Sequence, residues 1–169
     1  MCLTKKELRK VALVNRMELT KDEVISKSRV IHNKIEKEIN LDCRLGLYMP
    51  IKNEVDLTML LNKKVALPKI IDEMSLYRFN GDFERGMYDI LEPTGEEMEV
   101  DIIFIPGSVY DKNGYRIGYG KGYYDKYLMN RDIVKIGVCF DFQVVDNIPK
   151  EDHDVRLDLL ITDKKIYRW

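Results

Sequence analysis

The stretch from Ile105 to Leu128 reads IPGSVYDKNGYRIGYGKGYYDKYL and contains six of the chain's 10 tyrosines. It follows the apolar run Ile102–Ile105, which is typical of a buried strand. An apolar strand, a glycine-rich turn and a helix start form the usual phosphate cradle of an α/β protein, because glycines let backbone N–H groups approach an anion. Arg116 and Lys121 add positive charge, and Asp125 could hold a metal ion that bridges phosphates.

Neither of the two common phosphate loops fits this stretch. The ATPase loop requires Ser or Thr after Gly-Lys, whereas Gly122 follows Lys121. The dinucleotide loop requires a third glycine where Tyr123 stands. From the glycines alone, a flexible surface turn is an equally good interpretation. The neighbouring Arg, Lys and Asp side chains argue against the surface-turn interpretation.

Length and composition predict one α/β domain that spans residues 1–169. The chain has 169 residues and is 45% hydrophobic, which is enough to bury a core. Its net charge of −1 predicts no partnership with nucleic acid or with a membrane surface. The widely spaced Cys2, Cys43 and Cys139 indicate neither a disulfide framework nor a zinc site, and no signal peptide is recognisable. We therefore expect a cytoplasmic protein, and we expect it to be a monomer.

Two helices are predicted at the start of the chain, each opened by a capping box. Thr4-x-x-Glu7 precedes a helix that runs to about Met17, and Thr20-x-x-Glu23 precedes the second. The second helix has four apolar residues at helical spacing: Val24, Ile31, Ile35 and Ile39. Both helices are expected to lie on the face of a sheet.

Strands and shorter helices follow in alternation. The predicted strands are Leu45–Tyr48, Lys64–Leu67, Ser75–Phe79, Ile102–Ile105, Val134–Phe140 and Leu159–Thr162. Helices are expected over residues 54–61 and 123–129, and residues 81–99 are interpreted as a polar surface excursion. The alternation predicts a three-layer, Rossmann-like α/β fold, with a largely parallel sheet and helices on both faces.

Basic residues in the first helix form a second candidate site. Lys5 and Lys6 lie in its first turn, where positive charge is unfavourable by about 0.3–1 kcal/mol against the helix dipole. A bound anion would reverse the sign of that effect. Arg9 lies one turn further, on the same face as Lys5. A solvated basic patch is the alternative interpretation.

The longer pattern Ile105–Asp125 resembles the signature of the 5-formyltetrahydrofolate cyclo-ligase family. That signature is roughly Pro-Gly-x-x-Phe-Asp-x-x-Gly-x-Arg-Leu-Gly-x-Gly-x-Gly-Tyr-Tyr-Asp. Tyr110 and Ile117 replace its common Phe and Leu, and neither change removes a polar group. The run Lys5–Arg9 is similar to the family's opening Lys-x-x-Leu-Arg motif. Glu92-Pro93 resembles a family Glu-Pro in the otherwise weakest matching region.

The resemblance implies a set of site residues. Catalytic roles fall to Lys121, Arg116 and Tyr123. ATP binding falls to Lys5, Lys6, Glu7, Leu8, Arg9, Arg116, Ile117, Gly118, Tyr119, Gly120, Lys121, Gly122, Tyr123 and Tyr124. Substrate binding falls to Met49, Glu54, Tyr119, Gly120, Lys121, Gly122 and Tyr123. The implied metal ligands are Asp125 and Asp154.

Two of these positions also have a reading that needs no resemblance. Met49 and Glu54 follow the first predicted strand, and ligands of α/β sheets bind beyond the carboxyl ends of strands. A carboxylate at this place could accept hydrogen bonds from the N–H groups of a pterin. A surface glutamate that caps the next helix is equally consistent with the sequence.

The implied activity is ATP- and Mg²⁺-dependent conversion of 5-formyltetrahydrofolate, free or polyglutamylated, to 5,10-methenyltetrahydrofolate. The first alternative is a non-catalytic relative that binds a folate or a nucleotide. The second is a phosphosugar isomerase, which would need a base, and His153 is the one candidate. Ion pairing in its acidic loop is the simpler interpretation of His153. Arg16 either supports the bound anion or pairs with Glu18.

Overall fold

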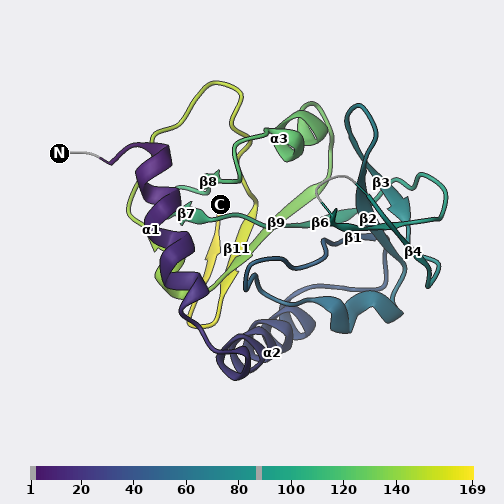
Figure 1. Cartoon of the computed structure of the whole chain (residues 1–169), viewed down its shortest axis with the longest axis horizontal. Helices are drawn as coiled ribbons and strands as arrows, with labels where there is room; N and C mark the ends of the chain where they lie inside the picture. The colour runs from purple at the N-terminus through teal and green to yellow at the C-terminus, as the bar shows by residue number, and fades with distance from the viewer. Residues whose placement is uncertain (1–2, 87–88) are drawn as a thin grey trace.

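The structure, a computed structural model, describes residues 3–86 and 89–169 (Figure 1). It begins with the two predicted helices, α1 (Lys5–Met17) and α2 (Lys21–Glu38). Before α1, the Thr4 hydroxyl accepts the Glu7 N–H, and the Glu7 carboxylate accepts the Thr4 N–H. Thr20 and Glu23 form the same reciprocal pair before α2. Local hydrogen bonds therefore define both helix starts.

A seven-stranded sheet runs through the centre of the molecule, in the order β12-β11-β9-β6-β1-β2-β3 (Figure 1). Neighbouring strands from β11 to β2 are parallel, and the edge strands β12 and β3 are antiparallel. The strands are β1 (Leu45–Gly46), β2 (Val65–Ile70), β3 (Met74–Arg78), β6 (Ile102–Ile105), β9 (Val134–Cys139), β11 (Leu159–Thr162) and β12 (Ile166–Arg168). The largely parallel sheet is therefore confirmed, with β6 at its middle.

Helices cover both faces of this sheet, as predicted. Figure 1 shows α2 on one side of the sheet and α3 (Tyr123–Leu128) on the other. On the α2 side, Ile35 belongs to the same buried cluster as Phe104 of β6. On the α3 side, Leu128 belongs to the same buried cluster as Ile103. Successive β6 residues point to opposite faces because the side-chain period of a strand is two.

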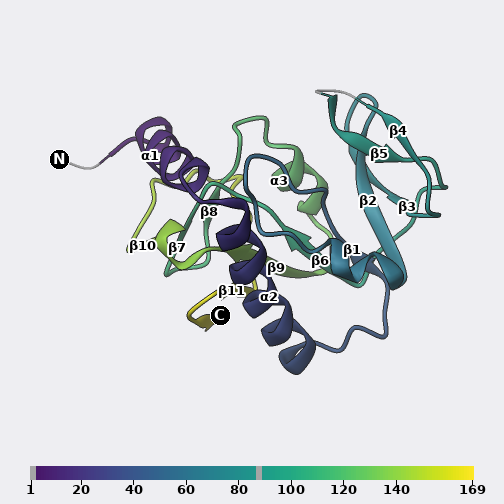
Figure 2. The ribbon, with the colours of Figure 1, turned by 60° about the horizontal axis from the view of Figure 1, so that its bottom comes forward.

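A second, smaller sheet lies beside the large one. It pairs β10 (Val144–Val145), β7 (Val109–Asp111) and β8 (Arg116–Ile117) in that order. Helix α1 lies on this sheet, where Ala12 packs with Val109 and Ile117 (Figure 2). Both N-terminal helices thus cover a sheet, but the sheet under α1 was not predicted. Strands of two or three residues are too short to show the alternation that identifies a strand.

Residues 81–99 depart furthest from the prediction. They contain an antiparallel hairpin of β4 (Phe83–Arg85) and β5 (Leu91–Pro93), beside β2 and β3 (Figure 2). Glu92 is only 5% exposed and Pro93 is also buried. The interpretation as a polar surface excursion is therefore wrong for these two residues. The charge of Glu92 concealed its burial, because a buried glutamate is uncommon.

Two predicted elements near β1 are shorter than expected. The strand predicted over Leu45–Tyr48 is regular only over Leu45–Gly46. The helix predicted over residues 54–61 is a 3₁₀ segment, Thr58–Asn62. The Glu54 carboxylate accepts the Ile51 N–H, which holds this stretch in a turn instead of starting a helix. Within the described residues, no helix is long and apolar enough to span a membrane.

Candidate active site

A cavity of about 1030 Å³ opens at the carboxyl ends of β1, β2 and β6. Most of its lining comes from the start of α1, the loop after β1, the β4–β5 hairpin, residues 116–126 and residues 151–154. The other lining residues are Pro68, Ile70, Met74, Pro106 and Met129. Ligands of parallel α/β sheets bind at this edge. The cavity therefore lies where the sequence predicts a site.

The glycine-rich loop, residues 116–122, forms one wall of this cavity. Gly120 and Gly122 have φ angles of +93° and +69°, which residues with a Cβ rarely adopt. A Cβ at Gly118 or Gly122 would meet no atom within 4 Å, and both residues line the cavity. The loop backbone thus faces open space with room for a ligand.

Two cations of α1 line the cavity. Arg9 Nε donates a hydrogen bond of 2.7 Å to the Gly118 carbonyl. Lys5 Nζ donates to carboxylate oxygens of Asp154 and Glu151, each at 2.7 Å. Partial burial lowers the pKa of Lys5, but these two hydrogen bonds raise it by more. The side chain therefore stays charged at neutral pH. Both predicted residues therefore line the cavity, Arg9 at the glycine-rich loop and Lys5 at residues 151–154.

Arg116 brings a buried positive charge to the cavity. The residue is 7% exposed, and its Nη1 lies 3.2 Å from Asp125 Oδ1. Its Cζ lies 5.9 Å from the centre of the Tyr124 ring, which also lines the cavity. Arg116 Nε is buried and has no hydrogen-bond partner among the described residues. A buried, unsatisfied guanidinium N–H is costly, which suits it to a ligand that brings an anion.

Carboxylates suited to a hard cation gather at the same cavity. Glu151, His153 and Asp154 offer ligand atoms within 4.8 Å of one another. Asp125 is not a member of that group among residues 3–86 and 89–169. Asp125 Oδ1 instead accepts the N–H of Val155, the residue after Asp154, at 3.1 Å. Mg²⁺ needs only one or two protein carboxylates when phosphates and water complete its shell, so these residues fit Mg²⁺ bound to phosphates.

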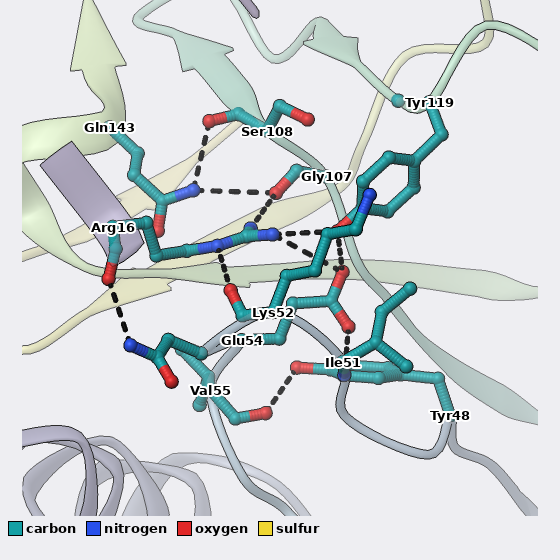
Figure 3. A network of polar contacts seen from close by, with 12 residues as sticks. Arg16, Tyr48, Ile51, Lys52, Glu54, Val55, Gly107, Ser108, Tyr119 and Gln143 are labelled. Carbon is teal, nitrogen blue, oxygen red and sulfur yellow. Dashed lines mark hydrogen bonds and ion pairs between the residues drawn. The ribbon is translucent and has the colours of Figure 1, made fainter. Parts of the chain in front are cut away.

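Glu54 is buried next to Tyr119 of the glycine-rich loop, and its exposure is 4% (Figure 3). Its carboxylate accepts the Tyr119 hydroxyl at 2.9 Å and the Ile51 N–H at 2.9 Å. Burial raises the pKa of Glu54, while the Ile51 N–H, the charge of Arg16 and the Tyr119 hydroxyl oppose that rise. Met49 lines the cavity beside it. The surface-cap interpretation of Glu54 is therefore wrong, because the side chain is buried against the cavity.

The remaining predicted residues divide into two groups. Ile117, Lys121 and Tyr123 line the cavity with the rest of the glycine-rich loop. Three residues of α1 are not among the cavity-lining residues in the described part of the chain: Lys6, Glu7 and Leu8. Glu7 closes the capping box of α1, and Leu8 packs against the cluster on the small sheet. Local structure accounts for Glu7 and Leu8, and Lys6 is exposed.

Two site features were missed or misjudged from the sequence. Glu92 of the hairpin lines the cavity, and its carboxylate accepts the Ile70 N–H at 3.2 Å. Its only sequence signal is the Glu-Pro match. Arg16 is 1% exposed and donates to the Tyr119 hydroxyl at 2.6 Å, so the suggested pair with Glu18 is wrong. No local pattern distinguishes a buried arginine from the solvated ones on the same helix.

Comparisons with known proteins agree with this arrangement. The chain matches the model of the 5-formyltetrahydrofolate cyclo-ligase family over residues 2–163. It is 32% identical to the 5-formyltetrahydrofolate cyclo-ligase of Mycoplasma pneumoniae, over 96% of this chain and 100% of that protein. It is 34% identical to the enzyme of the same name from Mycoplasma genitalium, over 93% and 96%.

A solved structure is similar over nearly the same length. The NMR structure of Aquifex aeolicus 5,10-methenyltetrahydrofolate synthetase superposes with a TM-score of 0.89 at 37% identity, covering 98% of this chain and 93% of that one. The sequence matches and the fold therefore indicate the same family. We conclude that the chain belongs to the 5-formyltetrahydrofolate cyclo-ligase family of enzymes.

Proposed function

We propose that the protein uses ATP and Mg²⁺ to cyclise 5-formyltetrahydrofolate to 5,10-methenyltetrahydrofolate, releasing ADP and phosphate. The observation that carries this proposal is the cavity itself. It joins a glycine-rich loop and the buried, incompletely paired Arg116 to the buried carboxylate of Glu54. The first two suit polyphosphate, and the third suits the N–H groups of a pterin.

The chemistry accounts for the kinds of residue at the site. A formamide oxygen is a poor leaving group, so the γ-phosphoryl group of ATP is transferred to the formyl oxygen and ADP leaves. N10 of the folate then attacks the formyl carbon, its proton is lost, and phosphate departs with the oxygen. Neither step needs a nucleophile from the protein. The protein positions the reactants and neutralises developing negative charge.

The cations of the site have separate tasks in this scheme. Arg116 and Lys121 contact the transferring phosphoryl group, and Tyr123 beside them helps to wall the reacting atoms from water. Arg9 holds the glycine-rich loop through the Gly118 carbonyl and presents its charge to the phosphates. Lys5 exchanges its contact with Asp154 for a phosphate oxygen when ATP binds. Asp125 and Asp154 would hold Mg²⁺, which supplies charge neutralisation on the phosphates when bound.

The folate occupies the other part of the cavity. Glu54 accepts hydrogen bonds from the pterin, and apolar side chains such as Met49, Ile70 and Leu91 pack against its rings. Both free and polyglutamylated folate are proposed substrates. We further propose that the protein acts as a monomer in the cytoplasm, where ATP is supplied. A monomer is supported by the fact that one chain brings the candidate residues around one cavity.

A non-catalytic relative that binds folate or nucleotide remains the second candidate. Its distinguishing feature would be the loss of charged groups from the phosphate site. Arg116, Lys121 and Asp125 all line the cavity, which favours the enzyme. The isomerase alternative depends on His153, whose side chain is 61% exposed and lies 3.7 Å from Glu151. That geometry suits an ion pair better than a sheltered base.

The test is the near-ultraviolet absorbance of the methenyl product in a mixture of protein, 5-formyltetrahydrofolate and Mg·ATP. We expect a rise that requires both ATP and Mg²⁺. Lys121→Ala should reduce the rate by about 10²–10³-fold, with an unchanged circular dichroism spectrum. Nucleotide binding without product would support the non-catalytic relative. Full activity of Lys121→Ala would contradict the catalytic role of that lysine.

A further inference from the structure

Arg16 is a fully buried arginine near the end of α1, at 1% exposure. Its guanidinium group donates three hydrogen bonds into three different segments (Figure 3). The acceptors are the Lys52 carbonyl at 2.8 Å, the Gly107 carbonyl at 3.1 Å and the Tyr119 hydroxyl at 2.6 Å. Arg16 therefore joins α1 to the loop after β1, the turn after β6 and the glycine-rich loop.

The surroundings of Arg16 are themselves held in place. Asn53 donates a side-chain N–H to the Arg16 carbonyl at 3.1 Å, and Gln143 donates to the same Gly107 carbonyl at 3.3 Å. The Lys52 ammonium also lies 5.3 Å from the centre of the Tyr119 ring. These contacts hold the Arg16 backbone and two of the groups that accept from its guanidinium.

A short hydrogen-bond relay leads from Arg16 to Glu54. Arg16 donates to the Tyr119 hydroxyl, and that hydroxyl donates to Glu54 Oε1 at 2.9 Å. The guanidinium itself lies 3.9 Å from the same carboxylate oxygen. Because a buried carboxylate without a partner is strongly unfavourable, this relay stabilises the ionised form of Glu54 and holds the side chain in place.

We infer that Arg16 is a positioning residue that couples the folate subsite at Glu54 to the nucleotide subsite of the glycine-rich loop. The identity of the two subsites rests on the proposed function. A displacement of the glycine-rich loop moves Tyr119, and through the relay it moves Glu54. The arrangement needs arginine, because a lysine ammonium cannot present three donors in one plane to three separate acceptors.

The first experiment measures positioning without any ligand. Hydrogen–deuterium exchange is compared for the wild type, Arg16→Gln and Tyr119→Phe. Tyr119→Phe is included because Tyr119 is 36% exposed, and an exposed position tolerates substitution better than a buried one. We expect faster exchange at residues 51–54 and 116–122 together in both variants. Lys34→Met is the matched control, since it removes a partly buried cation that donates to a backbone carbonyl, that of Thr162, in neither measured segment. Unchanged exchange in either segment of Arg16→Gln would overturn the inference.

The second experiment measures KM and kcat across pH. Glu54 is faced by charged and titratable groups from every side, namely Arg16, Tyr48, Lys52, Tyr110, Tyr119 and Tyr124. Losing the Arg16 charge raises the pKa of Glu54 further, so its carboxylate form is lost as pH falls through that higher value. We compare the KM for folate of Arg16→Gln with the wild-type KM at the same pH. The ratio of the two should grow by up to about tenfold per pH unit as pH falls below the raised pKa of Glu54.

Arg16→Lys distinguishes charge from geometry. It retains the positive charge, so it should remove most of the acid-side rise in KM while still exchanging faster than the wild type. A ratio that does not vary with pH in Arg16→Gln would mean that Arg16 only supports the fold. If the wild type forms no methenyl product, the proposed function fails, but the exchange measurement still decides whether Arg16 couples the two loops.

Discussion

The two N-terminal helices begin alike and serve different purposes. Both start with a Thr-x-x-Glu capping box, and both cover a sheet. Helix α2 buries Ile31 and Ile35 completely in the core of the large sheet. Helix α1 buries Arg16, and its Lys5 and Arg9 reach the cavity. A capping box therefore determines where a helix starts, whereas its other side chains decide whether it supports the fold or the site.

The largest expected effect is on the fold, through α2. Ile35→Ala removes a side chain with 0% exposure, and it should lower the free energy of unfolding by about 2–5 kcal/mol because a cavity is left. Activity per folded molecule should not change. Urea denaturation and a kcat measurement at low temperature check both points. Ile25→Ala is the control, because Ile25 of the same helix is 53% exposed. Equal destabilisation by Ile35→Ala and Ile25→Ala would contradict the assigned faces of the helix.

The next effect is on the site, through α1. Arg9→Ala removes the hydrogen bond to the Gly118 carbonyl and a charge beside the proposed phosphate site. A hydrogen bond to a charged group contributes about 1.5–3 kcal/mol, so kcat/KM for ATP should fall by about 10- to 100-fold. The melting temperature should also fall by several degrees, because the protein makes this hydrogen bond without ligand. Lys10→Ala changes the adjacent, exposed cation and should have no effect on kcat/KM; a matching loss there would indicate a general charge effect.

A smaller effect separates the two helix starts. Thr4→Ala and Thr20→Ala each remove a hydroxyl that accepts the N–H three residues later, and each should cost about 1 kcal/mol of stability. Only Thr4→Ala should also raise the KM for ATP, because Lys5 follows that cap directly. Thermal melts and ATP titrations measure the two effects. The serine variants keep the hydroxyl and should behave like the wild type. An equal change in KM from both alanine variants would remove the distinction.

The smallest effect should be the same in both helices. The N–H and the hydroxyl of Thr4 lower the pKa of Glu7, and those of Thr20 lower the pKa of Glu23. Because these pKa values lie below the ordinary value, the stabilisation is present above that value and is lost as pH falls through the lowered one. Carboxyl-carbon NMR titrations should show both shifts. Thr4→Ala should move Glu7 back towards the ordinary pKa and leave Glu23 unchanged; a parallel movement of both would contradict the local cause.

Much of the fold could be predicted because its signals are short in range. The capping boxes at Thr4 and Thr20 and the apolar run Ile102–Ile105 depend on neighbours within a few residues. The two- and three-residue strands of the small sheet and of the hairpin could not be recognised, since alternation needs a longer run. The hairpin that buries Glu92 was missed for a related reason. Its burial comes from packing beside β2, which residues 81–99 do not encode by themselves.

The site was predictable in its parts but not in its connections. The glycine-rich loop, Lys5, Arg9 and Glu54 all stood out in the sequence, and the structure brings them around one cavity. The link between them through Arg16 did not stand out, because a buried arginine and a solvated one look the same along the chain. The Asp125 and Asp154 pair as one metal site stays a prediction; without a ligand, Asp125 accepts the Val155 N–H and Asp154 accepts a hydrogen bond from Lys5.

The sequence by itself determined where the two helices start, which run forms the central strand, and where the glycine-rich loop that lines the cavity lies. Each of these depends on hydrogen bonds or periodicity within a few residues of the chain. The tertiary structure alone decided that α1 lies on a small sheet, that Glu92 enters the cavity, and that Arg16 contacts Tyr119 across 103 residues. Such contacts arise only when distant segments pack together, because burial then selects which polar groups must pair.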